Sequence, residues 1–334
     1  MGGGDWTEEA VAALRSRSRR EEAGHLVVSD ADLESVASQW GKPVLQIEHL
    51  ALAADMVPAR YLRNVGAVGT PGQMRLLDSR ATVVGLGGAG GLVAEILARA
   101  GVGTLVLVDP DCFEESNLNR QVLATRRTLG RPKAEVARER VHEINPHLQV
   151  VVRCQALTAD NARAILQEPA GASHQARVVV DCLDSGRSRL VLQAACRELG
   201  LPLVHGAIRG WQGRVLLVLP GGPGLECFYR EDDVPSPSEV LGSGAPAPTP
   251  ALMAAWQAGQ AVRVLLGDTS SAGQVFTFDL RSGQAGVVPF VLARMSAAWW
   301  RRRGKRDGQA GPGPFGRGET GGKSRGNPPE RFPR

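Results

Sequence analysis

Short apolar runs alternate with amphipathic stretches along the central part of the chain. The runs have the length of buried strands, and the stretches carry apolar residues at helical spacing. The predicted strands are ATVVGLG, GTLVLVD, LQVVVRCQ, RVVVDCLD and LPLVHGA, and the predicted helices are GLVAEILARAG, RPKAEVARERVHEINP and GRSRLVLQAACRELG. Strands that alternate with helices form βαβ units, so the sequence predicts an α/β fold with a mostly parallel sheet and helices on both faces.

The alternation changes character toward the C-terminus. QGRVLLVLPGG predicts an antiparallel edge strand, and QVFTFDLRSGQAGVVPF predicts two strands joined by a turn at residues 281–283. Between them lie the Pro/Gly/Ser-rich loop PSPSEVLGSGAPAPTP and the amphipathic helix ALMAAWQAGQAVRVLLG. An antiparallel C-terminal extension is therefore expected beside the parallel sheet.

Both ends of the chain differ from this central domain, which we place at residues 57–295. Residues 1–56 are polar with apolar positions near helical spacing, and predict a helical extension. That extension is either a cap packed on the main domain or a separate module that binds a partner. Residues 296–334 are rich in Gly, Pro and charge, and predict a disordered basic tail because they cannot bury enough apolar surface to fold.

The positive charge of the chain is concentrated in this tail. From Arg301 to Arg334 there are ten Lys/Arg and three Asp/Glu, a net of +7, so a chain total of +5 leaves about −2 for the rest. A near-neutral body disfavours nucleic acid as a partner, although the tail could tether the protein weakly to RNA or to an acidic partner.

The lengths of the apolar runs and the pattern of cysteines indicate the cellular compartment of the protein. No apolar run approaches the roughly 18 residues that span a bilayer, and no apolar segment precedes a cleavage site at the N-terminus. The five cysteines are scattered and form no CxxC pair. We therefore expect a cytoplasmic protein in a reducing compartment, without a membrane partner or a zinc site.

A glycine-rich turn follows the first predicted strand and reads GLGGAG, a GxGxxG fingerprint of Rossmann-like folds. Gly85 makes the tight turn, Gly87 and Gly88 let the backbone approach a phosphate, and Gly90 lets helix and strand pack closely. Asp109 ends the second strand 24 residues after Gly85, where an acidic residue can hold a ribose hydroxyl. An NAD enzyme and an ATP enzyme predict the same residues to this point.

The segment after the second strand favours ATP. Asn117, Arg120 and Gln121 follow that strand, and Lys133 begins the next helix thirteen residues after Arg120. The positive charges of Arg120 and Lys133 suit nucleotidyl transfer, because negative charge develops on the α-phosphate and on the departing pyrophosphate during that reaction. Asp181 and Asp184 end a further strand, and carboxylates beside a triphosphate predict Mg²⁺ binding.

The sequence resembles the MoeB/ThiF/HesA family, the bacterial relatives of ubiquitin-activating enzymes. The resemblance rests on the GxGxxG fingerprint together with the motifs LVDPD, SNLNRQ, GRPKAEVA, INPH and DCLD. The resemblance covers about residues 58–290. It implies that Mg·ATP adenylates the C-terminal Gly-Gly carboxylate of a ubiquitin-like sulfur-carrier protein, giving an acyl-adenylate and pyrophosphate. The motif RYLRN at residues 60–64 is similar to the family's N-terminal arginine motif, which implies a homodimer in which Arg63 reaches the partner subunit's triphosphate.

The resemblance carries roles over to individual residues. Asp184 would coordinate Mg²⁺, with Asp181 as a weaker candidate, and Asp111 is either a site residue or a cap at the start of a helix. The candidate catalytic residues are Arg63, Arg120, Lys133 and Asp184. The candidate nucleotide-binding residues are Gly85, Gly87, Gly88, Gly90, Asp109, Asp111, Asn117, Gln121 and Asp181.

The sequence also departs from the family pattern. It lacks the paired cysteines that bind zinc in many members, and the crossover loop near residues 239–250 contains no cysteine that could form a persulfide or thioester. Cys227 is the one cysteine near that loop. In the motif RYLRN, Asn64 stands where the family usually has Gln. These departures limit the prediction to the adenylation step.

Three alternatives remain open at this stage. A tRNA-modifying dehydratase would use the same chemistry on a carboxylate of tRNA. An NAD-dependent oxidoreductase would need a positioned acid for hydride transfer, but the chain contains only two tyrosines, Tyr61 and Tyr229, and no Tyr-x-x-x-Lys pair. A protein that binds nucleotide without catalysis is the third alternative.

Overall fold

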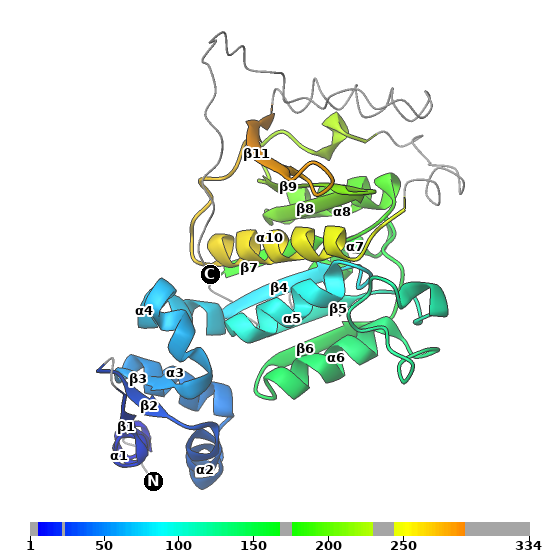
Figure 1. Cartoon of the computed structure of the whole chain (residues 1–334). Helices are drawn as coiled ribbons and strands as arrows, with labels where there is room; N and C mark the ends of the chain where they lie inside the picture. Colours follow the sequence, from blue (N-terminus) through cyan, green and yellow to red (C-terminus); the bar gives the residue numbers. More distant parts are fainter. Residues whose placement is uncertain (1–5, 22–23, 168–175, 230–243, 291–334) are drawn as a thin grey trace, which may run out of the picture.

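The predicted alternation forms one eight-stranded sheet with strand order β11-β10-β9-β8-β7-β4-β5-β6 (Figure 1). The structure is a computed structural model that describes residues 6–21, 24–167, 176–229 and 244–290. The predicted tail at residues 296–334 and residues 239–243 of the predicted crossover loop lie outside the described residues. The strands are β4 (Ser79–Val84), β5 (Thr104–Val108), β6 (Gln149–Arg153), β7 (Ala176–Asp181), β8 (Leu203–Arg209), β9 (Gln212–Val218), β10 (Gln274–Asp279) and β11 (Gln284–Pro289).

The sheet confirms the predicted fold class. Strands β4 to β8 pair in parallel with one another, and β9, β10 and β11 continue the sheet with antiparallel pairing. One prediction was wrong in detail, because β9 is an interior strand and β11 forms the edge. The outer edge of β9 pairs with β10, which is distant in the sequence, so the residues around β9 do not indicate this pairing.

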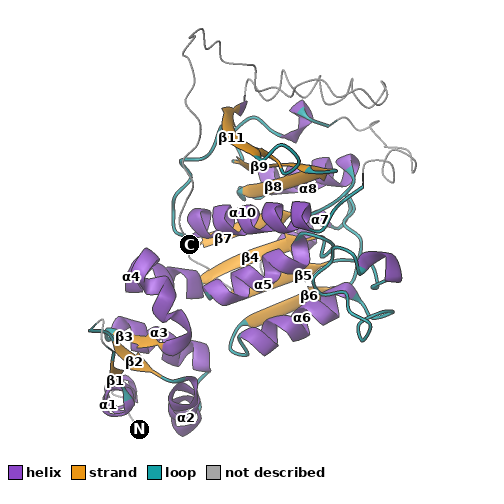
Figure 2. Cartoon of the chain, viewed as in Figure 1, coloured by secondary structure: helices purple, strands orange, loops and turns teal. Residues whose placement is uncertain are grey.

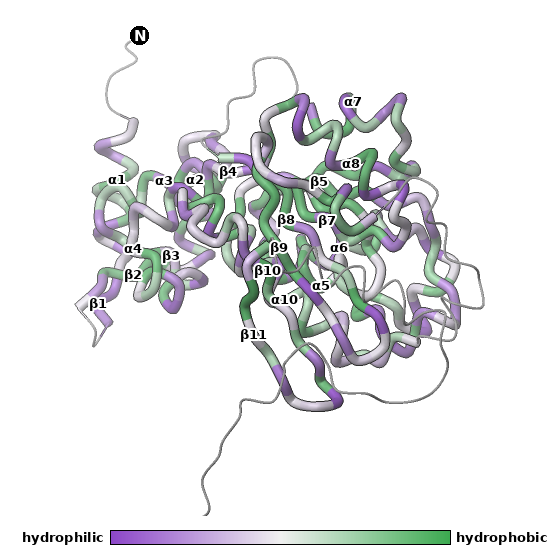
Figure 3. The backbone as a smooth tube through the Cα atoms, turned by 90° about the horizontal axis from the view of Figure 1, so that it is seen from above, coloured by the Kyte–Doolittle hydropathy of each residue, from purple (hydrophilic) through white to green (hydrophobic). Residues whose placement is uncertain are grey.

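Helices cover both faces of this sheet (Figure 2). One face carries α5 (Gly90–Ala100), α6 (Lys133–Ile144) and α10 (Pro248–Leu265), and the other carries α7 (Ala162–Leu166) and α8 (Gly186–Glu198). The apolar strand residues lie between these layers at the centre of the domain (Figure 3). Helix α10 begins three residues earlier than its apolar pattern predicted, at Pro248, because proline is well tolerated in a first helical turn.

The N-terminal extension is mainly helical, as predicted, but it also contains a small three-stranded sheet of order β1-β2-β3. Its strands have only two or three residues, which is too short to produce a visible alternation. The elements are α1 (Trp6–Arg17), β1 (Arg19–Arg20), β2 (Leu26–Val28), α2 (Asp30–Trp40), α3 (Val44–Ala53) and β3 (Met56–Pro58). They surround a separate apolar core that includes Leu14, Leu33 and Ile47.

Buried and partly buried polar contacts join the N-terminal unit to the α/β domain. Arg60 Nη2 lies 2.5 Å from Asp30 Oδ2, and Arg60 Nη1 donates to the carbonyl of Ile144. Asn145 Nδ2 donates to the Tyr61 hydroxyl at 2.8 Å, and His147 Nδ1 lies 3.1 Å from Glu48 Oε1. The RYLRN and INPH motifs therefore meet at this junction.

The junction continues through the short helix η1 (Ala59–Tyr61) into α4 (Leu62–Leu77), which ends immediately before β4. Gly69, with φ of 71°, kinks α4 in its middle. None of the helices within the described ranges has the length and apolar character needed to cross a membrane.

Candidate active site

The glycine loop between β4 and α5 has a conformation that only glycine permits at two positions. Gly85 has φ of 89°, and a Cβ there would lie 2.6 Å from the carbonyl oxygen of Cys182. A Cβ at Gly90 would lie 1.8 Å from the carbonyl oxygen of Gly85. Since real Cβ atoms do not approach oxygen so closely, these glycines allow α5 to pack directly against the loop and the end of β7.

The backbone N–H groups of Gly87 and Gly88 in this loop have no acceptor among the described residues. The N–H of Gly85 donates to Val108 O and that of Leu86 donates to Asp109, but those of Gly87 and Gly88 donate to no described residue. Both glycines are only half-buried, and they precede the N-terminus of α5, where the helix dipole is positive. Unpaired N–H groups at a helix N-terminus form a site for phosphate.

Asp109 connects this loop to the segment after β5. Its Oδ2 accepts from the N–H of Leu86 at 2.6 Å, and its Oδ1 accepts from the N–H of Asp111 at 2.9 Å. Burial raises the pKa of Asp109, and those two hydrogen bonds together with the nearby charge of Lys133 oppose that shift. The predicted ribose-binding residue thus also fixes the glycine loop, and its carboxylate oxygens keep lone pairs for a further donor.

Lys133 begins α6 and lies beside Asp109 and Asp111. Its side chain is 8% exposed, and Nζ lies 3.0 Å from Asp111 Oδ2, whereas the Asp111 side chain is 63% exposed. The backbone N–H of Lys133 also donates to Asp111 O. A nearly buried ammonium group beside Asp109, which binds the glycine loop, is well placed to meet a phosphate, since the Asp111 carboxylate that it pairs with is exposed and can move.

The segment that contains Asn117, Arg120 and Gln121 folds back over the glycine loop. Asn117 ends the short helix η2 (Glu115–Asn117), and its Oδ1 accepts from the N–H of Glu114 at 3.1 Å. The Gln121 amide group lies near Gly87, and its Oε1 is buried without a hydrogen-bond partner among the described residues. The Arg120 side chain lies against Gly88, and its Nη1 donates to Ser116 O and Asn119 Oδ1.

The two predicted carboxylates after β7 have different environments. Asp181 is fully buried, accepts from the N–H of Leu183, and lies 2.7 Å from Nδ1 of His205. Asp184 is exposed at the carboxyl end of the strand. Only Asp184 therefore presents its carboxylate toward solvent, whereas Asp181 supports the turn that carries it.

Arg63 lies away from the glycine loop of its own chain. It is exposed on α4, and its neighbour Asn64 contacts the carbonyl groups of Arg99 and Ala100 at the C-terminal end of α5. The glycine loop lies at the other end of that helix, and eleven residues at 1.5 Å per residue separate the ends by about 16 Å. The other candidate residues lie on the glycine loop and on the segments that follow β5 and β7, whereas Arg63 lies at the far end of α5.

Cys182 and Cys196 are not activated thiols. Burial raises the pKa of Cys182 far above its usual value, and its Sγ contacts Gln257 Oε1. Burial also raises the pKa of Cys196 to about 12. Cys227 is half-buried in the short helix η3 (Leu225–Cys227). A nucleophilic cysteine needs a lowered pKa, so Cys182 and Cys196 serve as packing groups.

Several residues at the site were not among those predicted from the sequence. Pro250 at the start of α10 packs against Gly88, and Gln257 of the same helix donates to Asp181 O at 2.8 Å. His205 lies on β8 directly beside Asp181 in the parallel register. A polar residue within the apolar run LPLVHGA was a signal for His205, but its partner depends on the pairing of two strands.

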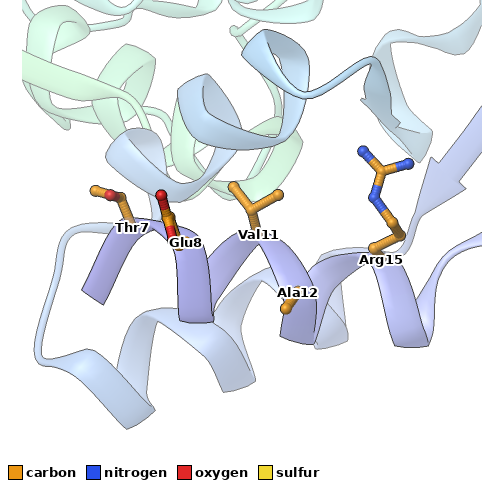
Figure 4. A pocket seen from close by; sticks show the side chains of 5 residues that line it. All are labelled: Thr7, Glu8, Val11, Ala12 and Arg15. Carbon is orange, nitrogen blue, oxygen red and sulfur yellow. The ribbon is translucent and has the colours of Figure 1, made fainter. Parts of the chain in front are cut away.

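A pocket of about 370 Å³ lies elsewhere, on the N-terminal unit (Figure 4). The residues that line it all belong to α1: Thr7, Glu8, Val11, Ala12 and Arg15. It contains none of the predicted site residues.

His205 makes the stability of the fold sensitive to acid. Burial lowers the pKa of His205 from 6.5 to about 4, although the hydrogen bond to Asp181 opposes that shift. The unfolded chain takes up this proton at pH 6.5 and the native protein does so only near pH 4, so the stabilisation present above pH 6.5 is lost as the pH falls between these values. A shift of this size corresponds to about 3 kcal/mol.

We expect the free energy of unfolding, measured in urea, to decrease when the pH is lowered from 7.5 to 4.5. This decrease should be about 3 kcal/mol larger in the wild type than in His205→Gln, because the variant has no titrating group at position 205. His142→Gln, a change at an exposed histidine of α6, should retain the wild-type slope. Equal slopes in the wild type and in His205→Gln would contradict the assignment.

The fold and the site define an α/β enzyme that binds the phosphates of a nucleotide. Residues 61–296 match the ThiF family. The sulfur carrier protein ThiS adenylyltransferase of Escherichia coli is 35% identical over 229 residues, which cover 67% of this chain and 88% of that protein. The SAMP-activating enzyme E1 of Haloferax volcanii is 36% identical over 237 residues, which cover 69% of this chain and 84% of that protein.

A solved structure has the same fold. It is the E. coli tRNA N6-threonylcarbamoyladenosine dehydratase TcdA in complex with ATP, with a TM-score of 0.52 and 26% identity, covering 63% of this chain and 95% of that chain. The chain belongs to the ThiF family, and it is an ATP-binding adenylyltransferase. This assignment replaces the NAD-dependent and non-catalytic alternatives.

Proposed function

We propose that this adenylyltransferase acts on the C-terminal Gly-Gly carboxylate of a ubiquitin-like sulfur-carrier protein, in a pathway of the molybdopterin or thiamine type. The observation that carries the proposal is the pair of unpaired N–H groups at Gly87 and Gly88, with Arg120 beside them and Lys133 held near the same loop. The substrate class is supported by two relatives named for activating carriers, ThiS and SAMP.

In the proposed reaction a carboxylate oxygen of the carrier attacks the α-phosphorus of ATP. The bond to the bridging oxygen breaks, and the electron pair leaves with pyrophosphate. The N–H groups of Gly87 and Gly88 would bind phosphate oxygens, and Lys133 and Arg120 would stabilise the charge that develops on the α-phosphate and the leaving group. No covalent enzyme intermediate is needed for this step.

The donor set also fits Mg²⁺. Asp184 is exposed at the carboxyl end of β7, whereas both oxygens of Asp181 are already bonded, so Asp184 would hold the ion. Bound there, Mg²⁺ would neutralise phosphate charge, with water completing its coordination.

We further propose that the enzyme is a homodimer in which Arg63 enters the partner's site. Arg63 is exposed, and the length of α5 separates it from the glycine loop of its own chain. An arginine supplied by a second subunit stabilises transition-state charge in other phosphoryl-transfer enzymes.

Mixing two inactive variants tests this arrangement. We expect Arg63→Ala and Lys133→Ala to be inactive separately, and a mixture refolded together to regain about a quarter of the wild-type rate, because half of random dimers are mixed and each has one intact site. Restored activity should be measured as pyrophosphate exchange into ATP. Failure of a verified mixed dimer to regain activity would show that Arg63 does not act across subunits.

Substrate selection provides the test of the main proposal. Pyrophosphate exchange into ATP should depend on a carrier with an intact Gly-Gly end, and the same carrier without its last two glycines should support none. If the enzyme binds ATP but none of the Gly-Gly carriers tested supports pyrophosphate exchange, the proposed substrate is refuted.

A second candidate substrate is a carboxylate on tRNA. Its support is the similarity to TcdA, which covers 95% of that chain, together with the net charge of +7 in residues 301–334. This candidate requires tRNA binding that weakens steeply with salt and is lost when residues 301–334 are deleted.

A further inference from the structure

A buried polar network lies directly behind the turn that carries Asp184. Asp181 Oδ2 is 2.7 Å from Nδ1 of His205, and both side chains are fully buried. The Tyr229 hydroxyl is 3.1 Å from Nε2 of the same histidine. Arg189 Nη1 and Arg214 Nη2 donate to that hydroxyl oxygen at 2.7 and 2.9 Å.

The partners determine which atoms carry the protons. The carboxylate of Asp181 can only accept, so Nδ1 of a neutral His205 carries the proton and donates. Its Nε2 is then an acceptor, and the Tyr229 hydroxyl donates to it. The two lone pairs of the phenol oxygen are left for Arg189 and Arg214. The groups from Asp181 Oδ2 through His205 to the Tyr229 hydroxyl are therefore satisfied in one arrangement only.

This network fixes the backbone immediately before Asp184. The N–H of Leu183 donates to Asp181 Oδ1 at 3.0 Å, and the carbonyl of Leu183 accepts from Arg189 Nε at 3.1 Å. The carbonyl of Asp181 accepts from Gln257 Nε2. The orientation of the Asp184 carboxylate thus depends on Asp181 and Arg189, and through them on His205 and Tyr229.

Tyr229 also determines which group Arg189 binds. Arg189 binds the carbonyl of Leu183, the residue immediately before Asp184, so the Asp184 carboxylate lies near its guanidinium. Although burial acts to lower the pKa of Arg189, this negative charge helps to raise it. The Arg189 guanidinium is instead engaged by the Tyr229 hydroxyl and Leu183 O. Asp181 Oδ2 already lies 3.9 Å from Arg189 Nε, but both oxygens of Asp181 accept other hydrogen bonds. Without the hydroxyl, one guanidinium nitrogen would lack its acceptor, and the exposed carboxylate of Asp184 would be the charged group free to accept from it.

Tyr229 is itself held in place from α8. It follows η3, and the N–H of Leu225 in η3 donates to Gln193 Oε1. Glu226 of the same segment accepts from Gln193 and Arg197. Three hydrogen bonds from α8 therefore secure the segment that delivers the tyrosine.

We propose that Tyr229 and His205 are positioning residues for adenylation, which keep Arg189 from pairing with Asp184 and so leave that carboxylate available to Mg²⁺. The inference rests on the proposed role of Asp184 in Mg·ATP binding. Neither residue touches the nucleotide; both act through Arg189 and the turn at residues 181–184.

The Mg²⁺ dependence of the full-length Tyr229→Phe variant tests this inference. At saturating ATP and carrier, the Mg²⁺ concentration for half-maximal pyrophosphate exchange should rise about 5- to 10-fold, because a salt bridge to Arg189 competes with the ion. The maximal rate at high Mg²⁺ should return close to that of the wild type.

Tyr61→Phe is the matched control, because it removes the same hydroxyl from the other tyrosine, whose partners are Asn145 and Glu48 at the N-terminal junction. It should leave the Mg²⁺ concentration for half-maximal exchange unchanged. His205→Asn retains a donor toward Asp181 but cannot reach Tyr229, so it should show a smaller shift of the same sign. It also provides the test if Tyr229→Phe does not fold.

A lower maximal rate with an unchanged Mg²⁺ requirement in both variants would overturn the inference. A failure of the proposed substrate is distinguishable from this result, because the wild type would then show no carrier-dependent exchange. Calorimetric titration of ATP at several Mg²⁺ concentrations would in that case still compare Tyr229→Phe with the wild type.

Discussion

Replacing Lys133 by alanine should abolish pyrophosphate exchange, with a loss of at least about 10³-fold in rate, because it removes a nearly buried cation beside the phosphate loop. Stability should change little, since the partner carboxylate of Asp111 is exposed and the pair is worth about 1 kcal/mol or less. Arg120→Ala should cause a comparable loss of exchange.

Arg138→Ala is the control for this experiment, because it removes a cation from an exposed position of the same helix α6. Its exchange rate and its melting temperature should match those of the wild type. If Lys133→Ala exchanged within about 10-fold of the wild type while folded, Lys133 would not be the principal cation of the site.

Gly90→Ala should remove ATP binding, with a loss of affinity of at least about 100-fold, because a methyl group there collides with the carbonyl oxygen of Gly85 at 1.8 Å. Either the glycine loop or α5 must move to relieve this contact, and the N–H groups of Gly87 and Gly88 then lose their common orientation. Unfolding should also require about 3 kcal/mol less free energy than in the wild type.

Gly259→Ala provides a matched control in the exposed part of α10, where no atom lies within 4 Å of the added methyl group. It should preserve ATP affinity and stabilise the fold by up to about 1 kcal/mol, because alanine favours helix. Calorimetry and urea unfolding measure both quantities. Unchanged ATP affinity in Gly90→Ala would show that the nucleotide does not depend on the loop.

The parallel core of the fold could be predicted because β4, β5 and β7 are largely apolar runs buried on both faces, and the helices between the strands have clear apolar stripes. The strands β1 to β3 could not, because two or three residues carry no period. The position of β9 inside the sheet was missed because its neighbour β10 is contributed by a distant segment.

The candidate site divides in the same way. The glycine loop, Asp109 and Lys133 act through local chain geometry, and their spacing indicated them. His205, Tyr229 and Gln257 join the site through strand register and helix packing, which sequence spacing does not encode. The different environments of Asp181 and Asp184 also depend on which of the two carboxylates meets β8.

The mass of a carrier protein after incubation with the enzyme, Mg²⁺ and ATP tests the central claim most directly. With pyrophosphatase present to prevent reversal, we predict that a carrier with a Gly-Gly end gains the mass of one adenylyl group at its C-terminus, and that the Lys133→Ala enzyme produces no such adduct. Absence of the adduct from every Gly-Gly carrier tried, with an enzyme that binds ATP, would contradict the account.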